Sequence, residues 1–329
     1  MRMTNRLIAG ALLACALLPV GCKRQDANGT GAASANAPQH VQIALNWKPE
    51  PEFGGFYAAQ ASGAYASRGL DVEILPGGSG TPTVQMVGAG RAEFGIASAD
   101  EVILARQNHN DVVAIFAVYQ TNPQGLMTHA ERGFNSIADV FTHPGTLAIQ
   151  RGLPYADFLE KKYGFDKVTV VPNTAGIPAF LRDPNMTLQC FVTSEPLVAQ
   201  KAGAKVKTFL VADAGYNPYT AVLVTRGDYL RSHGDVAKSL VSAVRDGWAA
   251  YLKDPAPANA VMTRLNPTVD APTAAAMADA QKQLIETADT QKAGLGAMAA
   301  DRWRTLIQQL QDLKVVTSPP KAEECFANP

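Results

Sequence analysis

The sequence predicts an α/β fold of two lobes that are joined by two crossing strands. From residue 41 to about residue 210, short apolar segments typical of strands alternate with helical segments, a rhythm that is typical of parallel β/α architecture. The alternation breaks twice, at residues 120–123 and 213–219. After the second break, one further strand is followed almost entirely by segments with helical apolar stripes. These three observations give the fold class.

The first β/α series precedes the first break. Its expected strands lie at 41–45, 72–75, 94–97 and 112–119. Its expected helices lie at 58–65, 83–89 and 100–108. The last of these strands is long and apolar throughout, which is typical of a strand that is buried on both faces.

The second series lies between the two breaks. Its expected strands lie at 126–129, 146–149, 168–171, 188–192 and 206–210, and its expected helices at 155–163, 177–181 and 196–202. A strand at 220–225 then returns, and stripes such as Trp303, Leu306 and Leu310 predict helices that pack on a core. We therefore expect one discontinuous lobe at 41–122 and 219–329, a second lobe at 123–218, and a ligand cleft between them.

The first 40 residues predict export. Arg2 and Arg6 precede an apolar run at 7–20 that has the length of a signal peptide and is too short to span a bilayer. The small residue before Cys22 resembles the lipobox of bacterial lipoproteins, although Pro19 stands where that family usually has Leu. The resemblance implies that Cys22 is lipidated, and the alternative is an ordinary exported cysteine. We expect a signal peptide at 1–21 and, because residues 22–40 have no apolar period, a flexible tether there.

The composition excludes several classes of function. Hydrophobic residues make up 47% of the chain, charged residues 18%, and the formal net charge is +0. Without a basic excess, nucleic acid is not an expected partner. No set of Cys and His has the spacing of metal ligands, so neither a metal nor a cofactor is expected. Cys190 and Cys325 remain for the mature fold, where they could pair in an oxidising compartment or stay buried as thiols.

The most informative segment for function is 45–57, which is dense in aromatic and acidic residues. It lies between the first strand and the first helix, and open α/β sheets bind ligands at the carboxyl ends of their strands. The segment therefore predicts the wall of a small-molecule pocket. The alternative is a loop whose aromatic residues cover an edge of the core.

Several segments together resemble one family. In chain order they are Leu45-Asn46-Trp47, Gly54-Gly55-Phe56-Tyr57-Ala58-Ala59, Gly63-Ala64-Tyr65, Gly69-Leu70-Asp71-Val72, Gly90-Arg91-Ala92-Glu93-Phe94-Gly95-Ile96 and Val192-Thr193-Ser194-Glu195-Pro196. Over residues 41–310 the chain resembles the substrate-binding proteins of ABC importers that bind thiamine pyrimidine precursors, with nitrate, sulfonate and taurine binders as more distant relatives. The resemblance implies a type-II periplasmic-binding fold that closes around its ligand. It also implies a monomer at the periplasmic or cell-surface face, with an ABC permease of the inner membrane as partner.

The resemblance also implies ligand-binding positions. Trp47 follows the first strand, where relatives stack an aromatic ring on a flat ligand, and Glu195 matches the acid of an Asn-Glu-Pro-like turn, with Ser194 in place of the usual Asn. The remaining positions are Phe53, Tyr57, Ser98, Asp100, Tyr119 and Tyr216. Structural alternatives exist for most of them. Trp47, Tyr119 and Tyr216 could instead pack at the hinge, and Asp100 and Glu195 could instead cap helices.

These residue types fit a flat heterocycle that forms hydrogen bonds. Aromatic faces stack on such a ring, and a carboxylate accepts hydrogen bonds from its amino groups. The expected function is capture of a thiamine pyrimidine precursor or a similar heterocycle for an ABC importer. A flavin or a small sulfonate-type anion is the alternative, because the turn at 77–82 offers backbone N–H groups to an anion. Arg151, in a turn of the second lobe, could pair with an acid group or stay solvated.

An exported enzyme of the same fold is the rival hypothesis. The chain has no G-x-S-x-G or H-E-x-x-H segment and no credible Ser/His/Asp arrangement. Fungal enzymes of pyrimidine-precursor synthesis share the fold and consume an active-site His, whereas Glu52 and Phe53 stand in the related segment here. We therefore expect binding without turnover. A sensor that feeds a signalling partner is a third hypothesis.

Overall fold

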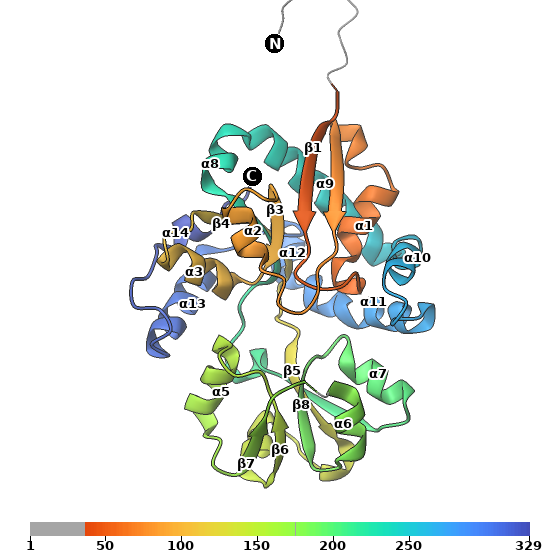
Figure 1. The fold of residues 1–329 in the computed structure, drawn as a ribbon, viewed down its shortest axis with the longest axis vertical. Coiled ribbons are helices and arrows are strands. Elements are labelled where there is room, and N and C mark those ends of the chain that lie inside the picture. Colours follow the sequence, from red (N-terminus) through yellow and green to blue (C-terminus); the bar gives the residue numbers. More distant parts are fainter. Residues whose placement is uncertain (1–36, 175) are drawn as a thin grey trace, which may run out of the picture. The chain divides into compact units, whose positions relative to one another are not determined.

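The structure, a computed structural model, describes residues 37–174 and 176–329, which form two five-stranded sheets with their helices (Figure 1). The expected signal peptide at 1–21, Cys22 and the tether as far as residue 36 lie outside the described residues. The last residues assigned to the tether are part of the fold, because the first strand begins at Gln39 and pairs there with Leu70.

The first sheet has the strand order β2-β1-β3-β10-β4. Its strands are β1 (Gln39–Ala44), β2 (Leu70–Leu75), β3 (Phe94–Ala97), β4 (Val112–Tyr119) and β10 (Thr220–Arg226). The helical elements between the first four strands are η1 (Pro51–Phe53), α1 (Gly54–Ala61), η2 (Ala66–Arg68), α2 (Thr83–Gly88) and α3 (Ala99–Gln107). The segment 45–57 therefore connects the end of β1 to η1 and the start of α1.

The second sheet has the strand order β7-β6-β8-β5-β9. Its strands are β5 (Gln124–His129), β6 (Gly145–Ala148), β7 (Val168–Val171), β8 (Met186–Phe191) and β9 (Val206–Leu210). The helical elements of this lobe are η3 (Ala130–Arg132), α4 (Ile137–Thr142), α5 (Pro154–Tyr163), α6 (Gly176–Arg182), α7 (Glu195–Lys201) and η4 (Ala212–Ala214). The helix α4 has no counterpart among the expected elements.

Each sheet contains one antiparallel strand, and the parallel pairing that the β/α rhythm predicts holds for the other strands. β10 runs antiparallel to β3 and β4, and β5 runs antiparallel to β8 and β9. These are the first strands after the two crossings, residues 120–123 and 211–219. A crossing segment carries no helix that would turn the chain back over its own sheet, so the next strand enters the other sheet in the opposite sense. The backbone N–H of Asn122 donates to Asn217 Oδ1 at 2.8 Å and joins the two crossing segments.

The C-terminal third of the chain is helical and packs on the first sheet (Figure 1). Its helices are α8 (Gly227–Ser232), α9 (Gly234–Lys253), α10 (Ala256–Leu265), α11 (Ala271–Ile285), α12 (Ala288–Ala293), α13 (Ala300–Asp312) and α14 (Ala322–Cys325). α9 approaches the start of α1 closely, since a Cβ on Gly55 would lie 2.2 Å from the ring of Trp248. The glycines at 54 and 55 therefore allow the aromatic residues of α9 to fix the helix that follows the 45–57 segment.

Both cysteines of the mature fold are buried free thiols, so the structure contains no Cys190–Cys325 disulfide. Cys190 belongs to β8 and Cys325 to α14. Between residues 37 and 329, no described helix combines the length and the apolar character that a bilayer span requires.

Candidate functional site

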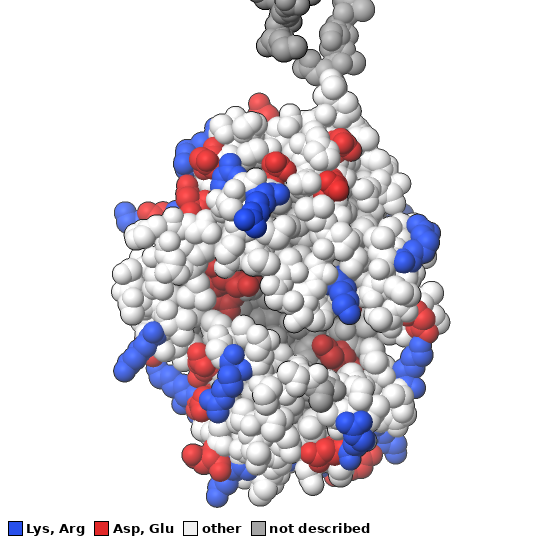
Figure 2. All heavy atoms as spheres, in the orientation of Figure 1, with Lys and Arg blue, Asp and Glu red and all other residues white. Residues whose placement is uncertain are grey.

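A cavity of about 500 Å³ lies between the two lobes, within the range of small-molecule sites. Residues after β1 and β3 form its wall on the side of the first sheet, and residues of α5, β8 and α7 form its wall on the second. The two crossing segments contribute Asn122 and Tyr216. Figure 2 shows the molecule hollowed at its middle, with acidic side chains on two sides of the hollow.

The structure brings six of the nine expected ligand-binding residues to this cavity: Trp47, Phe53, Ser98, Asp100, Glu195 and Tyr216. Residues 77–82, the turn that could hold an anion, are not among the described residues that line it.

Three expected residues lie elsewhere. Tyr57 is buried inside the first lobe with 3% of its surface exposed, because it lies on the face of α1 that packs against the core. Tyr119 is fully buried at the end of β4, and its hydroxyl donates to Gln281 Oε1 at 2.7 Å, which agrees with the packing alternative. Arg151 turns to its own lobe, where it forms an ion pair with Glu160 at 2.6 Å.

Trp47 lines the cavity with a partly exposed side chain. Its backbone carbonyl accepts a hydrogen bond from Gly77 N–H at 3.0 Å, which holds the start of the segment. The side chain remains 38% exposed, whereas Phe53 at the other end of the segment is fully buried. Phe53 therefore anchors the segment in the core while Trp47 faces the cavity.

Asp100 ties the start of α3 to the return crossing. Ser98 is the N-cap of α3, and its backbone N–H donates to Glu101 Oε2 at 2.8 Å in a capping box. The hydroxyl of the fully buried Tyr216 donates to Asp100 Oδ2 at 2.9 Å, and Ser98 donates to Asp100 Oδ1. These contacts occupy both oxygens of Asp100, so its role here is to fix the wall of the cavity.

Glu195 begins α7 and faces the cavity from the second lobe. Its Oε2 accepts the backbone N–H of Phe191 at 2.8 Å. Burial raises the pKa of this carboxyl, and hydrogen bonds from backbone N–H groups partly oppose the rise. Glu195 therefore stabilises the start of its helix and also presents a carboxyl to the cavity.

Glu50 and Glu52 line the same cavity, although the sequence prediction did not include them. Burial, and then the charge of Glu195, raise the pKa of Glu50 from about 4.5 to about 7. Burial and the charges of Glu50 and Glu195 raise the pKa of Glu52 well above its ordinary value. The acidic character of the 45–57 segment was the sequence signal for both residues. Their position in a cavity wall could not be predicted, because the second lobe forms the opposite wall.

Polar residues outside the predicted set complete the wall. Gln189 on β8 accepts a hydrogen bond from the hydroxyl of Tyr155 at 2.7 Å, and both residues line the cavity. Asn46 follows the end of β1, and its buried Oδ1 has no hydrogen-bond partner among the described residues. The only sequence signal for Asn46 was its position immediately before Trp47. No feature of the sequence around Gln189 predicted that it would line the cavity.

The charge of the cavity wall is acidic. Its carboxyls belong to Glu50, Glu52, Asp100, Glu101 and Glu195. In the part of the chain that the structure describes, no Lys, Arg or His lines it, and no three His, Cys, Asp or Glu side chains are grouped as a metal site would need. The wall can therefore accept hydrogen bonds from an amino-bearing or cationic ligand, and it opposes an anionic one.

Comparison with known proteins places these observations in a family. A family model described as NMT1/THI5 like matches residues 50–258. The formylaminopyrimidine-binding protein of Halalkalibacterium halodurans is 23% identical over 313 residues, which cover 90% of this chain and 92% of that protein. The riboflavin-binding protein RibY of Chloroflexus aurantiacus is 21% identical over 342 residues, which cover 95% of this chain and 94% of RibY.

An enzyme is also among the relatives. The 4-amino-5-hydroxymethyl-2-methylpyrimidine phosphate synthase of Schizosaccharomyces pombe is 21% identical over 229 residues, which cover 65% of this chain and 66% of the enzyme. Among solved structures, the periplasmic aliphatic sulphonate binding protein SsuA of Escherichia coli superposes with a TM-score of 0.69 at 13% identity, covering 89% of this chain and 93% of SsuA. This likeness confirms the predicted two-lobed periplasmic-binding-protein fold.

Proposed function

Because the chain belongs to the NMT1/THI5-like family, we propose that it is an extracytoplasmic solute-binding protein that captures a small amino-bearing heterocycle and delivers it to an ABC importer. One observation carries the choice of ligand. The cavity combines an exposed Trp47 ring with carboxyls and no basic side chain among the described residues of its wall. A flat ring with amino donors satisfies both features, because it stacks on the indole and donates to the carboxyls.

An aminopyrimidine is the first candidate within this class. Its amino group can donate a hydrogen bond to the carboxyl of Glu195, which lines the cavity. A sulfonate is disfavoured, because its negative charge would lie among five carboxyls without a counter-charge in the wall. A flavin is the second candidate, since a cavity of about 500 Å³ is large enough for a ligand of several rings.

We further propose binding without turnover. The described wall contains no histidine that could serve as a base or as a consumed group. Burial, and then the charge of Glu195, raise the pKa of the Cys190 thiol well above its ordinary value, which disfavours the nucleophilic thiolate. The synthase among the sequence relatives makes this part of the proposal worth testing directly.

The test uses purified protein, 4-amino-5-hydroxymethyl-2-methylpyrimidine, riboflavin and an alkanesulfonate. Mass spectrometry first identifies any ligand released from denatured protein, and calorimetry then measures the three affinities. We expect the pyrimidine to bind more tightly than the flavin, no measurable sulfonate binding, and recovery of unchanged pyrimidine after prolonged incubation. Preferential sulfonate binding would contradict the ligand class, and a new product would contradict binding without turnover.

A lipid anchor at Cys22 is a separate proposal, supported by the lipobox-like sequence and the tether-like composition of the residues that follow. We expect Cys22→Ser to move the protein from the membrane fraction to the soluble fraction in cells. Cys325→Ser, which removes a buried thiol of the folded part, is the control and should leave fractionation unchanged. Absence of a lipid mass on the wild type would contradict the anchor.

A further inference from the structure

Three carboxyls from different lobes line the same cleft. Glu50 and Glu52 flank Pro51 at η1 in the first lobe, and Glu195 begins α7 in the second. All three line the main cavity, and the charge of Glu195 acts on both of the others. A second, much smaller cavity lies beside them between the same two segments, lined by Glu50, Pro51, Glu52, Thr193, Ser194, Met277 and Gln281. We call Glu50, Glu52 and Glu195 the carboxyl cluster.

The surroundings of the cluster supply little compensating charge. Glu50 Oε1 accepts a hydrogen bond from Asn266 Nδ2 at 3.3 Å. Lys48, an exposed neighbour in sequence, is the cation that acts on Glu50, and its effect is the weakest of those that lower the pKa. The charges that act on Glu52 are those of Glu50 and Glu195.

The groups that pack beside the cluster are neutral. Glu195 receives hydrogen bonds from the N–H groups of its own residue and of Phe191. The carboxyl cluster interacts electrostatically with three other titratable residues, Tyr119, Tyr155 and Cys190. Burial raises the pKa of each of these residues, so each stays protonated and neutral. The cluster therefore lacks a protein cation in contact with it in the described residues.

Asn46 lies on the same segment as Glu50 and Glu52 and also lines the cavity. The buried Oδ1 of Asn46, on the segment that also carries Glu50 and Glu52, has no donor among the described residues. A buried acceptor without a donor is destabilising, and buried carboxylates without a cation are more so. A bound group that brings N–H donors and a positive charge would compensate the carboxylates that line the cavity.

We propose that the cleft selects organic cations, and that the N–H groups of the bound cation replace protons that the carboxyl cluster holds when no ligand is present. This inference rests on the proposed solute-binding function and narrows its ligand to the charged members of the amino-bearing class. No covalent bond forms or breaks. One positive charge enters the cluster, and up to one proton leaves to water, so the net charge of the cluster stays nearly constant.

The exchange predicts a direction for the pH dependence. Protons compete with the cation at low pH, so affinity rises as the pH increases toward the pKa of Glu50 at about 7. A ligand that keeps its own charge in this range, such as an alkylammonium or an amidinium, then shows a plateau above it. A neutral amino-bearing ligand gains only a stronger hydrogen-bond acceptor from an ionised carboxyl, so its affinity rises less over the same range.

Two matched pairs of probes test the inference. The first pair is 4-amino-5-aminomethyl-2-methylpyrimidine, which carries an ammonium group, and its neutral hydroxymethyl analogue. The second pair is benzamidine, a flat cation, and the nearly isosteric neutral benzamide. Calorimetry at about pH 6 and about pH 8, each in two buffers of different ionisation enthalpy, gives both the affinity and the number of protons released.

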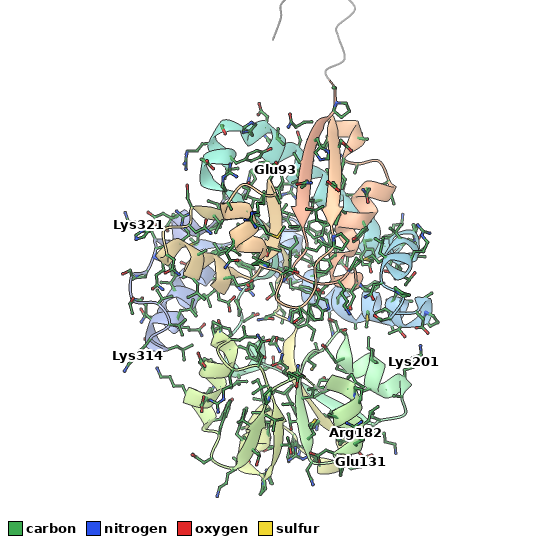
Figure 3. All side chains as sticks on the ribbon, in the orientation of Figure 1. Glu93, Glu131, Arg182, Lys201, Lys314 and Lys321 are labelled. Atoms are coloured by element: carbon green, nitrogen blue, oxygen red, sulfur yellow. The ribbon has the colours of Figure 1, made fainter. Side chains whose placement is uncertain are left out.

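We expect the cation of each pair to bind at least about tenfold more tightly than its neutral partner at the higher pH, and proton release to be measurable near neutral pH. The double variant Glu50→Gln, Glu52→Gln should lose this preference while it keeps its fold by circular dichroism. Glu131→Gln, an exposed site at the far end of the second lobe (Figure 3), should keep the preference.

Several results would overturn the inference. They are equal binding of the neutral partners, a preference that survives in the double variant, and no binding of either cation at millimolar concentration. Failure of the heterocycle proposal has a different signature, since benzamidine would still be preferred over benzamide while both pyrimidines failed to bind.

Discussion

Trp47 and Glu195 line the cavity from opposite lobes, and we propose that they bind different parts of one ligand. Trp47 lies on the first lobe with a partly exposed ring, and Glu195 lies on the second with a carboxyl that faces the same cavity. The ring offers area and a stacking geometry, whereas the carboxyl offers acceptors. A ligand that contacts both therefore bridges the lobes.

Removing the Trp47 ring should weaken binding of the heterocycle without unfolding the protein. Loss of a stacking partner costs about 1–3 kcal/mol, which corresponds to about tenfold to a hundredfold in affinity. Calorimetry of Trp47→Ala measures this loss, and Leu265→Ala, which truncates a side chain that is 52% exposed on α10, is the control. If a folded Trp47→Ala variant bound the ligand with wild-type affinity, Trp47 would not be part of the ligand site.

Glu195→Gln tests the acceptor on the opposite wall. With an amino-bearing ligand, the amide is a weaker acceptor than the carboxylate, so affinity should fall by about tenfold or more. With an anionic ligand, the same substitution would increase affinity because it removes a nearby negative charge. The sign of the change in calorimetry therefore distinguishes the two ligand classes independently of its size.

Glu50 links the cleft to stability. Its pKa is about 7 in the folded protein and about 4.5 when unperturbed, so the folded state binds a proton more tightly than the unfolded chain. The contribution of Glu50 to the free energy of unfolding is therefore fully present below about pH 4.5, and it is lost as the pH rises through about 7. Glu50→Gln should remove this loss and make the variant more stable than the wild type at pH 8, by at most about 3 kcal/mol.

Denaturant unfolding at several pH values checks the Glu50 prediction. The difference in unfolding free energy between variant and wild type should grow across the acidic-to-neutral range. Glu131→Gln makes the same substitution at an exposed position. Its free energy of unfolding should depend on pH as that of the wild type does. A difference that is independent of pH would mean that Glu50 stays ionised in the folded protein.

At the scale of secondary structure elements, α11 connects parts of the cleft that lie far apart in the sequence. Gln281 of α11 donates to the carbonyl of Pro51 at 2.9 Å and accepts from Tyr119 at the end of β4. Near its start, Asp270 forms an ion pair with Lys201, which Figure 3 shows at the outer end of α7. The same helix therefore supports the segment that carries Glu50 and Glu52 and also contacts the helix that carries Glu195.

Gln281→Leu should destabilise the protein, because it leaves the Pro51 carbonyl and the Tyr119 hydroxyl buried without their partner. Each unsatisfied group costs about 1–3 kcal/mol, and the variant should also bind more weakly because Glu50 and Glu52 lose their support. Gln283→Leu, the same change at an exposed position of α11, is the control. Thermal unfolding and calorimetry together measure both effects, and a Gln281→Leu variant that behaves like Gln283→Leu would contradict this role.

At the scale of the whole molecule, two crossing segments join lobes that share one ligand site. Residues 120–123 and 211–219 carry no long helix and can absorb changes in backbone angles, as hinges do. A ligand that contacts both lobes stabilises the arrangement in which they approach each other. The proposed transport cycle therefore involves an open and a closed form.

Small-angle scattering tests this motion on the full chain. Adding a saturating amount of the bound heterocycle should reduce the radius of gyration. Trp47→Ala at a ligand concentration that saturates the wild type but not the variant should show a smaller reduction. An unchanged radius with saturated wild-type protein would indicate a static cleft.

Much of the element order follows from local sequence. Strands β3 and β4 begin and end where their apolar runs do, because a buried strand needs continuous apolar character over its own length. Helix α4 was missed because its six residues are too few for a helical period. Its capping box of Ser136 and Asp139 was the available signal.

The direction of the strands after each crossing required the tertiary structure. The alternation of strands and helices predicted parallel pairing, yet β5 and β10 are antiparallel to their neighbours. A strand pairs through its backbone, and its side-chain pattern is compatible with either direction once both faces are covered. The partner sheet that the chain enters after a crossing decides the direction.

The sequence by itself determined the α/β class, the two β/α series and the aromatic, acidic character of the segment after β1. Those properties depend on residues that are close together in the chain. Only the tertiary structure decided that Tyr57, Tyr119 and Arg151 do not line the cavity, because helix faces and distant partners such as Gln281 and Glu160 set their orientation. It also placed Glu50 and Glu52 opposite Glu195, since burial and the approach of like charges arise where the two lobes meet.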